Sequence, residues 1–244
     1  MIVVLPAYNE EANIGRLLNR IQEAMEESSF RYRVIVVDDG STDRTAEILE
    51  EYASRMPLQV ARHKVNQGLG ATIRDGIYLA AKSASGNDVI VTMDSDETHP
   101  PGLIARMAGL IREGHDVVIA SRYQPGGRVC GLTAGRRLIS YLASLMCRVV
   151  FPTKGVRDYT CGFRAYRGEI LHQALARYGD DFVAPGGFQC MVDILLKLRR
   201  AGAIMGEAPL ILRYDLKRGQ SKMKLARTAL GTLSLLARHR FKPR

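Results

Sequence analysis

The chain has 244 residues, of which 46% are hydrophobic and 25% charged, and this balance excludes a disordered chain, a collagen and a disulfide-stapled miniprotein. Its apolar runs are all shorter than the roughly 20 residues that span a bilayer. The net charge of +10 is uneven, because residues 213–244 hold ten Lys or Arg and one acid, and so carry +9. Such a basic tail favours a polyanionic partner, namely a membrane surface, a nucleic acid or phosphate groups; a solubilising tail is the alternative.

The four cysteines are widely spaced, and no C-x-x-C pair occurs: Cys130, Cys147, Cys161 and Cys190. We interpret them as reduced thiols rather than a disulfide framework or a zinc site. The first predicted strand begins at Ile2, which leaves no room for a signal peptide. A cytoplasmic protein is therefore expected.

Short apolar runs alternate with helical spacings over the first 120 residues. The pattern predicts strands at residues 2–5, 34–37, 58–61, 88–93 and 116–120. Helices are expected between them, the first capped by Asn9 and the second by Ser41 or Thr42. Such alternation predicts a mostly parallel sheet with helices on both faces, which binds ligands beyond the carboxyl ends of its strands.

The pattern becomes irregular after residue 121. Gly126 and Gly127 mark a loop, and helices are predicted at residues 135–150, 168–178 and 188–201, followed by a strand at residues 209–214. The tail from Ser221 onward can form a basic amphipathic helix. Without an internal repeat or linker, we expect one catalytic domain over residues 1–220 and a basic amphipathic tail over residues 221–244.

Two carboxylates come directly after the fourth predicted strand. Asp94 and Asp96 are separated by one residue, in the segment MDSDETHPP. Hard oxygen ligands at a strand end suit Mg²⁺ or Mn²⁺, and either ion also binds a diphosphate. A loop of solvated, helix-capping acids is the alternative for so short a motif.

Polar residues also follow the first two predicted strands. Asp38 and Asp39 can accept hydrogen bonds from a ribose or a base, and Tyr8 can pack against a base. Each segment alone is also consistent with a capped turn.

The segments VVLPAYNEEANI, VDDGSTDRTAEIL, NQGLGATIRDG and VTMDSDETHPP together resemble the inverting family-two glycosyltransferases of GT-A fold. The later segments ASRYQPGG, RRLIS, DYTCGFRAY, GEAPLIL and RGQSK resemble the branch of dolichyl-phosphate mannosyltransferases and their bacterial polyprenyl-phosphate relatives. The resemblance implies a three-layer, Rossmann-like GT-A fold with a basic C-terminal amphipathic segment.

The resemblance also implies a role for individual residues. The residues expected to bind the nucleotide sugar are Pro6, Tyr8, Glu10, Val37, Asp39, Asp94, Ser95 and Ser221. The metal, Mg²⁺ or Mn²⁺, would be held by Asp94, Asp96 and Thr98, with Asp96 as principal ligand. The residues expected to carry catalysis are Asp96, Arg122, Arg136 and Lys222, whose cations would bind the phosphates of donor or acceptor. The chain departs from these relatives at Leu216, where an Arg is usual, and at Asp193, where a Glu is usual.

A phosphate acceptor fits this set of residues. A lipid monophosphate is already anionic and needs little or no general base, whereas an alcohol does. The sequence has no late Glu-Asp motif for that base, and it has no Trp and so no Q-x-x-R-W motif. We therefore expect a metal-dependent, inverting hexosyltransferase that moves mannose from GDP-mannose to a polyprenyl or dolichyl monophosphate.

Two alternatives remain open at this stage. The donor can be UDP-glucose or another UDP-sugar, or the enzyme can be a soluble glycosyltransferase that uses Asp193 or another acid as base on a non-lipid acceptor. A nucleic-acid-binding module is disfavoured, because the tail carries no RNA-binding signature.

A lipid acceptor implies a peripheral enzyme on the cytoplasmic face of a membrane. Two stretches can dock there: the apolar stripe from Leu138 to Val149, flanked by Arg136, Arg137 and Arg148, and the basic tail. A membrane tether subunit is another means of attachment, and burial of the first stripe in the core is the alternative to docking.

Overall fold

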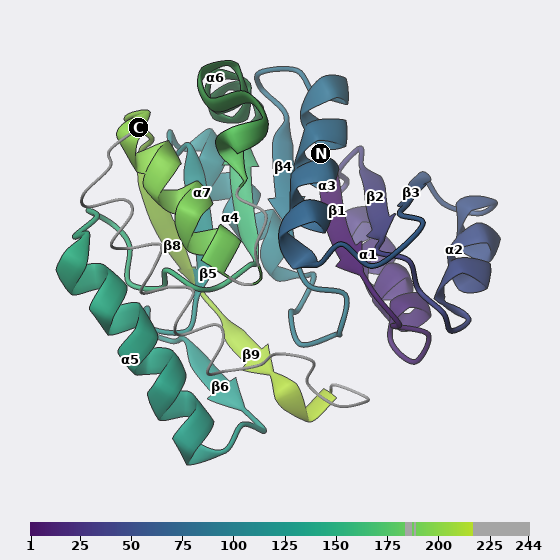
Figure 1. Ribbon diagram of the computed structural model, residues 1–244, viewed down its shortest axis with the longest axis horizontal. Coiled ribbons are helices and arrows are strands. Elements are labelled where there is room, and N and C mark those ends of the chain that lie inside the picture. Colours follow the sequence, from purple (N-terminus) through teal and green to yellow (C-terminus); the bar gives the residue numbers. More distant parts are fainter. Residues whose placement is uncertain (184–186, 188, 217–244) are drawn as a thin grey trace.

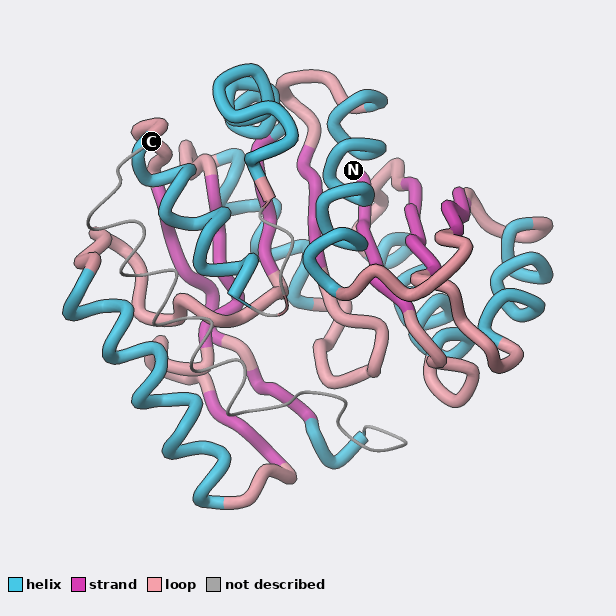
Figure 2. Tube along the Cα trace, viewed as in Figure 1, coloured by secondary structure: helices cyan, strands magenta, loops and turns pink. Residues whose placement is uncertain are grey.

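Strands and helices alternate along the first half of the chain, as the sequence predicts (Figures 1 and 2). The structure is a computed structural model that describes residues 1–183, 187 and 189–216. The strands are β1 (Ile2–Ala7), β2 (Arg33–Asp38), β3 (Leu58–Arg62), β4 (Val89–Thr92), β5 (Val117–Ser121), β6 (Arg128–Cys130), β7 (Arg164–Arg167), β8 (Met205–Pro209) and β9 (Ile211–Arg213). The α-helices are α1 (Ile14–Glu27), α2 (Thr45–Ala53), α3 (Leu69–Ser83), α4 (Leu103–Arg112), α5 (Ala134–Val150), α6 (Gly168–Tyr178) and α7 (Gln189–Arg200), with 3₁₀ turns η1 (Gly179–Phe182) and η2 (Tyr214–Leu216).

Seven of the described strands form one sheet in the order β3-β2-β1-β4-β7-β5-β8. All neighbouring strands run parallel except β7, which is antiparallel to both β4 and β5. Helices α1, α2 and α4 cover one face, and α3, α6 and α7 cover the other (Figure 1). The three-layer arrangement and the mostly parallel sheet expected from the sequence are thus confirmed.

The register of β1 with its neighbours places three loops at one edge of the sheet. Ala7, the last residue of β1, lies opposite Asp38, the last residue of β2. On the other side of β1, Val4 lies opposite Thr92, the last residue of β4. The loops that follow these strands therefore emerge side by side, where parallel α/β sheets bind their ligands.

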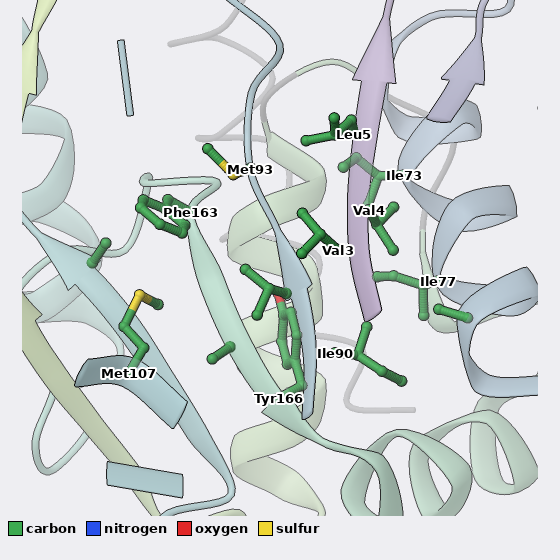
Figure 3. Packing of buried hydrophobic residues seen from close by; sticks show 14 of the residues in the cluster. Val3, Val4, Leu5, Ile73, Ile77, Ile90, Met93, Met107, Phe163 and Tyr166 are labelled. Carbon is green, nitrogen blue, oxygen red and sulfur yellow. The ribbon is translucent and has the colours of Figure 1, made fainter. Parts of the chain in front are cut away.

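The hydrophobic core lies on both sides of β1, which explains why residues 2–5 of this strand are all apolar. Val3, Val4 and Leu5 are fully buried, because helices cover both faces of the strand. Figure 3 shows Ile73 and Ile77 of α3 packed against β1. Burial of a Val or Leu side chain contributes about 1.5–3 kcal/mol, so this strand is a major source of stability.

Both helix caps predicted near the sheet edge were wrong. Helix α1 begins at Ile14 with Asn13 at its N-cap, and α2 begins at Thr45 with Arg44 at its N-cap. Asn9 instead adopts a left-handed conformation with φ of 52°, which Asn tolerates better than most residues. The polar residues that follow β1 and β2 bind one another across the sheet edge rather than capping their own helices.

The later helices match the prediction, but the later strands do not. The predicted strand at residues 209–214 is divided between β8, which joins the main sheet, and β9, which pairs with β6 in a separate two-stranded sheet. Strand β7 was not expected, because its sequence RAYR carries two arginines. Arg164 is nevertheless fully buried, and its guanidinium donates to the backbone carbonyls of Tyr159, Cys161 and Met191.

Helix α5 lies at the end of the molecule opposite α2 and β3 (Figure 1). Of its residues only Ser144 and Cys147 are buried. The expected boundary between residues 220 and 221, and the whole amphipathic tail, lie outside the described residues. Among the described helices, none combines the length and the apolar character needed to cross a bilayer.

Gly76 tests the close packing of α3 on the sheet. A Cβ atom at this position would lie 2.4 Å from Cγ1 of Val4. We predict that Gly76→Ala lowers the free energy of unfolding by about 1–3 kcal/mol, because the core must shift to admit the methyl group. Urea denaturation measures this change.

Gly109→Ala is the matched control, because a Cβ there meets no atom within 4 Å. It lies inside α4, where replacing Gly by Ala stabilises a helix by about 0.5–1 kcal/mol. Equal destabilisation by the two variants would contradict the packing argument.

Candidate active site

The loops after β1 and β2 are joined by hydrogen bonds. The backbone N–H of Asn9 donates to Oγ of Ser41 at 2.9 Å, and the N–H of Thr42 donates to Oδ1 of Asn9 at 2.8 Å. The N–H of Glu10 donates to Oγ1 of Thr45 at 2.8 Å. These reciprocal contacts hold the two loops in one fixed arrangement at the sheet edge.

The loop after β4 exposes its two aspartates and buries their neighbours. Asp94 and Asp96 are half-buried, whereas Ser95 and Glu97 are buried. Oγ of Ser95 donates to the carbonyl of Pro6 at 2.8 Å, which ties this loop to the end of β1. The alternation leaves both aspartates partly accessible at the edge.

Further contacts fix the far side of the same loop. Glu97 has φ of 62°, which is unusual for a residue other than Gly, and its carboxylate forms an ion pair with Arg16 of α1. The N–H of Asp94 donates to Nδ1 of His99, whose ring stacks on Phe163 at 5.1 Å. The loop is thus held both from α1 and from Phe163, the residue just before β7.

The carboxylates of this loop fit a divalent ion that also binds a diphosphate. Asp94 and Asp96 supply hard oxygens, and Mg²⁺ or Mn²⁺ is commonly held by one or two carboxylates together with substrate phosphates and water. Oγ1 of Thr98 donates to Oδ1 of Asp96 at 2.7 Å and so orients that carboxylate. The described part of the chain has no cluster of three or more His, Cys, Asp or Glu side chains that could hold a metal ion by itself. An ion at Asp94 and Asp96 would therefore need the substrate phosphates and water as its other ligands.

The residues predicted to bind the nucleoside lie together at the ends of β1 and β2. Tyr8 and Glu10 are half-buried, and Oε2 of Glu10 accepts a hydrogen bond from the side chain of Asn13 at 2.7 Å. Val37 is fully buried within β2, between β1 and β3. Asp39 is 2% exposed, and its carboxylate is bonded to the loop that follows β3.

Arg122 lies at the end of β5 in a buried ion pair that the sequence did not indicate. Its Nε and Nη2 contact the two carboxylate oxygens of Asp158, each at 2.7 Å. Nη1 donates to Ser140 of α5 at 2.9 Å, and Nη2 also donates to Thr160. The guanidinium therefore joins the segment before β7 to helix α5, and most of its N–H groups are already used.

This pairing sets the charge of both groups. Burial alone would raise the pKa of the Asp158 carboxyl, but the Arg122 guanidinium and several backbone N–H groups hold that pKa below its usual range. Although burial opposes its charge, Arg122 has a raised pKa because of Asp158. Both groups are therefore ionised near neutral pH.

The other predicted cations are placed only in part. Arg136 lies in the first turn of α5 and is half-buried. Ser221 and Lys222, expected to close over the diphosphate, lie outside the described residues. His63 lies in no motif of the sequence, but in the structure its ring contacts two carboxylates, those of Asp39 and Asp75.

The chain belongs to glycosyl transferase family 2, whose model matches residues 2–175. It is 35% identical over 223 residues to a dolichol-phosphate mannosyltransferase of Pyrococcus furiosus, covering 91% of this chain and 58% of that protein. It is 31% identical over 224 residues to an undecaprenyl-phosphate mannosyltransferase of Micrococcus luteus, covering 91% of this chain and 87% of that protein. The chain thus spans little more than half of the Pyrococcus relative. The expected family and enzyme class are confirmed.

Solved structures agree on the fold. Glucosyl-3-phosphoglycerate synthase of Mycobacterium tuberculosis, crystallised with Mn²⁺, UDP and glucosyl-3-phosphoglycerate, superposes with a TM-score of 0.69 at 23% identity and covers 97% of this chain and 78% of its own. The same enzyme with Mg²⁺ and UDP gives a TM-score of 0.66 at 21% identity, covering 97% of this chain and 78% of its own. At this identity the similarity establishes the GT-A fold.

The buried pair of Arg122 and Asp158 predicts a large loss of stability on substitution. Asp158→Asn leaves the guanidinium buried without its counter-charge, and we expect the free energy of unfolding at pH 7 to fall by about 3–5 kcal/mol. Glu47→Gln, in an exposed ion pair with Arg44, is the control and should change it by less than about 1 kcal/mol.

The same pair predicts a dependence on pH. Because the pKa of Asp158 is depressed in the folded state, its contribution is complete above the unfolded value of about 3.9 and is lost as pH falls through the folded value. The difference between wild type and Asp158→Asn should therefore shrink below about pH 4. A difference that stays constant down to pH 2 would contradict the ion pair.

Proposed function

We propose that this protein transfers a hexose, with inversion, from a nucleotide diphosphate donor to a polyprenyl monophosphate in the presence of Mg²⁺ or Mn²⁺. The observation that carries the proposal is the carboxylate pair Asp94 and Asp96, fixed at the shared ends of β1 and β4. Support comes from relatives, found over 91% of the chain, that are named as transferases of sugars to dolichol phosphate or undecaprenyl phosphate.

GDP-mannose is the proposed donor, and mannose is the sugar transferred. Both of those relatives are named mannosyltransferases. A third relative, 34% identical over 174 residues, is named a polyprenol monophosphomannose synthase and comes from Mycolicibacterium smegmatis. A UDP-sugar remains the second candidate. A sugar other than mannose is supported by a Pseudomonas aeruginosa relative, 36% identical over 176 residues, that is named as a transferase of 4-deoxy-4-formamido-L-arabinose.

The described residues divide the chemistry between them. Asp94 and Asp96 would hold the metal, which supplies positive charge to the diphosphate leaving group when bound. An oxygen of the acceptor phosphate forms the bond to the anomeric carbon on the face opposite the nucleoside diphosphate, and the bond from that carbon to the diphosphate oxygen breaks. Arg136 and Lys222 are proposed to contact the phosphates and so bring two anions together.

The arrangement of Asp193 disfavours the rival with an alcohol acceptor. That acceptor needs a general base, for which Asp193 or another acid was the candidate. Asp193 is 2% exposed, and its Oδ2 lies 2.6 Å from Nζ of Lys197, one turn further along α7. A buried carboxylate paired with an ammonium is poorly placed to take a proton from a substrate hydroxyl. A phosphate acceptor avoids this requirement.

Helix α5 supports a membrane surface as a partner. Leu138 is 57% and Val149 73% exposed, and the apolar side chains of Ile139, Tyr141 and Leu142 are exposed as well. Most of this stripe therefore lies on the surface, although Met146 packs against the core. Arg136, Arg137 and Arg148 on the same helix can meet anionic headgroups, each contributing about 1 kcal/mol near the surface.

We therefore propose peripheral attachment on the cytoplasmic face of a membrane, where α5 lies in the interface. The basic tail, outside the described residues, is proposed to add to this attachment, and a tether subunit is a further candidate partner. Nucleic acid is not a proposed partner.

Asp96→Asn tests the proposed chemistry. The substitution keeps the shape of the side chain and removes its charge, so we predict that transfer from GDP-mannose to undecaprenyl phosphate with Mn²⁺ falls by at least about 100-fold. The thermal unfolding midpoint should stay near that of wild type, because Asp96 is half-buried in a loop. Glu113→Gln, an exposed acid at the end of α4, is the control and should retain full activity. Normal turnover by Asp96→Asn would refute the assignment.

Leu138→Ser combined with Leu142→Ser tests the membrane surface. Flotation with anionic liposomes at low salt should decrease at least about fivefold, because each substitution removes an apolar side chain from the interface. Ile204→Ser, at an apolar residue 59% exposed just before β8, is the matched control and should float like wild type. If all three proteins float equally, α5 does not dock.

A further inference from the structure

His63 lies directly after β3, and its ring bridges two carboxylates. Nδ1 lies 2.7 Å from Oδ1 of Asp39, and Nε2 lies 3.0 Å from Oδ2 of Asp75 in α3. Ionised carboxylates only accept hydrogen bonds, so both ring nitrogens donate when these contacts are formed. The geometry therefore selects the imidazolium, which carries a proton on each nitrogen.

The carboxylate of Asp39 also accepts hydrogen bonds from the backbone of the β3–α3 loop, residues 63–68. Its Oδ1 accepts from the N–H of Gln67 and its Oδ2 from the N–H of Gly68, each at 2.8 Å. Gly40 allows this loop to approach, because a Cβ on Gly40 would lie 2.9 Å from the backbone of Val65. The Asp39 carboxylate thus ties Gln67 and Gly68 to the turn after β2, and the N–H of His63, which donates to the carbonyl of Asp38 at 2.9 Å, holds the start of the same loop.

The β3–α3 loop forms one wall of a polar cavity. The cavity is lined by Gly40, Ser41, Thr42, Arg62, His63 and Lys64, and so opens beyond the carboxyl ends of β2 and β3. Ser41 and Thr42 bind Asn9, in the loop after β1 that also carries Tyr8. The cavity therefore adjoins the residues assigned to the donor nucleoside.

We propose that His63, as an imidazolium, is a positioning residue for the nucleoside of the donor. It fixes Asp39, Asp39 fixes the β3–α3 loop, and the affinity for nucleotide depends on the charge of His63. This inference rests on the proposed function, because it assumes a nucleotide donor at this edge of the sheet. His63 itself makes no contact with the reacting atoms in this account.

The charges around His63 come from three elements. Asp39 follows β2, Asp75 lies in α3, and Arg74 beside it binds the other oxygen of Asp75 at 2.7 Å. The flanking Arg62 and Lys64 are cationic, and Nε of Arg62 lies 3.2 Å from Oδ2 of Asp38. Two carboxylates in direct contact outweigh these more distant positive charges.

The pKa values follow from this balance. Burial alone would lower the pKa of His63, but the hydrogen bonds that its ring donates to Asp39 and Asp75, together with their negative charges, raise it above its ordinary value of about 6.5. The imidazolium and its contribution are therefore fully present below pH 6.5 and are lost as pH rises through the raised value.

Equilibrium binding of GDP with Mn²⁺ to the full chain tests the inference, with UDP as the second probe. From about pH 6.5 to about pH 9, wild-type Kd should rise as His63 loses its proton. His63→Gln should bind about tenfold more weakly at the lower pH, because it cannot donate to both carboxylates, and its Kd should vary less with pH. His172→Gln is the matched control, because that ring binds only the carbonyl of Ala81 among the contacts described.

Ring resonances of His63 in the NMR spectrum supply a readout that transfer activity does not. The midpoint of the ring titration should coincide with the midpoint of the change in wild-type Kd. This comparison holds even if His63→Gln does not fold, and midpoints that differ would overturn the inference.

The possible failures are distinguishable. If His63→Gln binds GDP as tightly as wild type with the same pH profile, the inference is overturned and the proposed function stands. If wild-type protein binds neither GDP nor UDP, the proposed function is contradicted and the inference falls with it.

Discussion

The parallel pairing of β1 with both β2 and β4 is the constraint on which the rest of the site depends. It brings the ends of three strands to one edge, although the loops that follow them are separated by tens of residues in the sequence. The apolar runs that form these strands are buried on both faces, so a shift of register would disrupt their packing against the helices on each side of the sheet. Stability and the placement of the polar loops thus have one cause.

Each polar loop at that edge is fixed by a neighbour rather than by its own helix. Asn9 binds the turn after β2, Ser95 binds the end of β1, and Asp39 binds the loop after β3. Arg122 does the same further along the sheet, where Asp158 holds it against α5. Such cross-links present Asp94 and Asp96 without the need to order them when a ligand arrives, and this preorganisation favours both binding and catalysis.

The sequence predicted what depends on local pattern and missed what depends on distant partners. Strand runs, the helices from residue 135 onward and the carboxylate pair were legible because spacing and strand ends define them. The caps at Asn9 and Ser41 were wrong because those side chains bind across the sheet edge. Strand β7 was missed because the burial of Arg164 depends on backbone carbonyls that accept its hydrogen bonds, and these come close to Arg164 only after folding. The partners of Arg122 and His63 were hidden for the same reason, since Asp158 and Asp75 carry no local signal.

The identity of the acceptor is the central claim, and one transfer assay tests it most directly. Labelled GDP-mannose and Mn²⁺ are supplied to the full chain with undecaprenyl phosphate, with undecaprenol, which lacks only the phosphate, or with a free sugar. The account predicts labelled lipid from undecaprenyl phosphate and none from the other two, because the described site offers a carboxylate pair for the donor and pairs its candidate base, Asp193, with Lys197. Transfer to undecaprenol or to the free sugar at a comparable rate would contradict it.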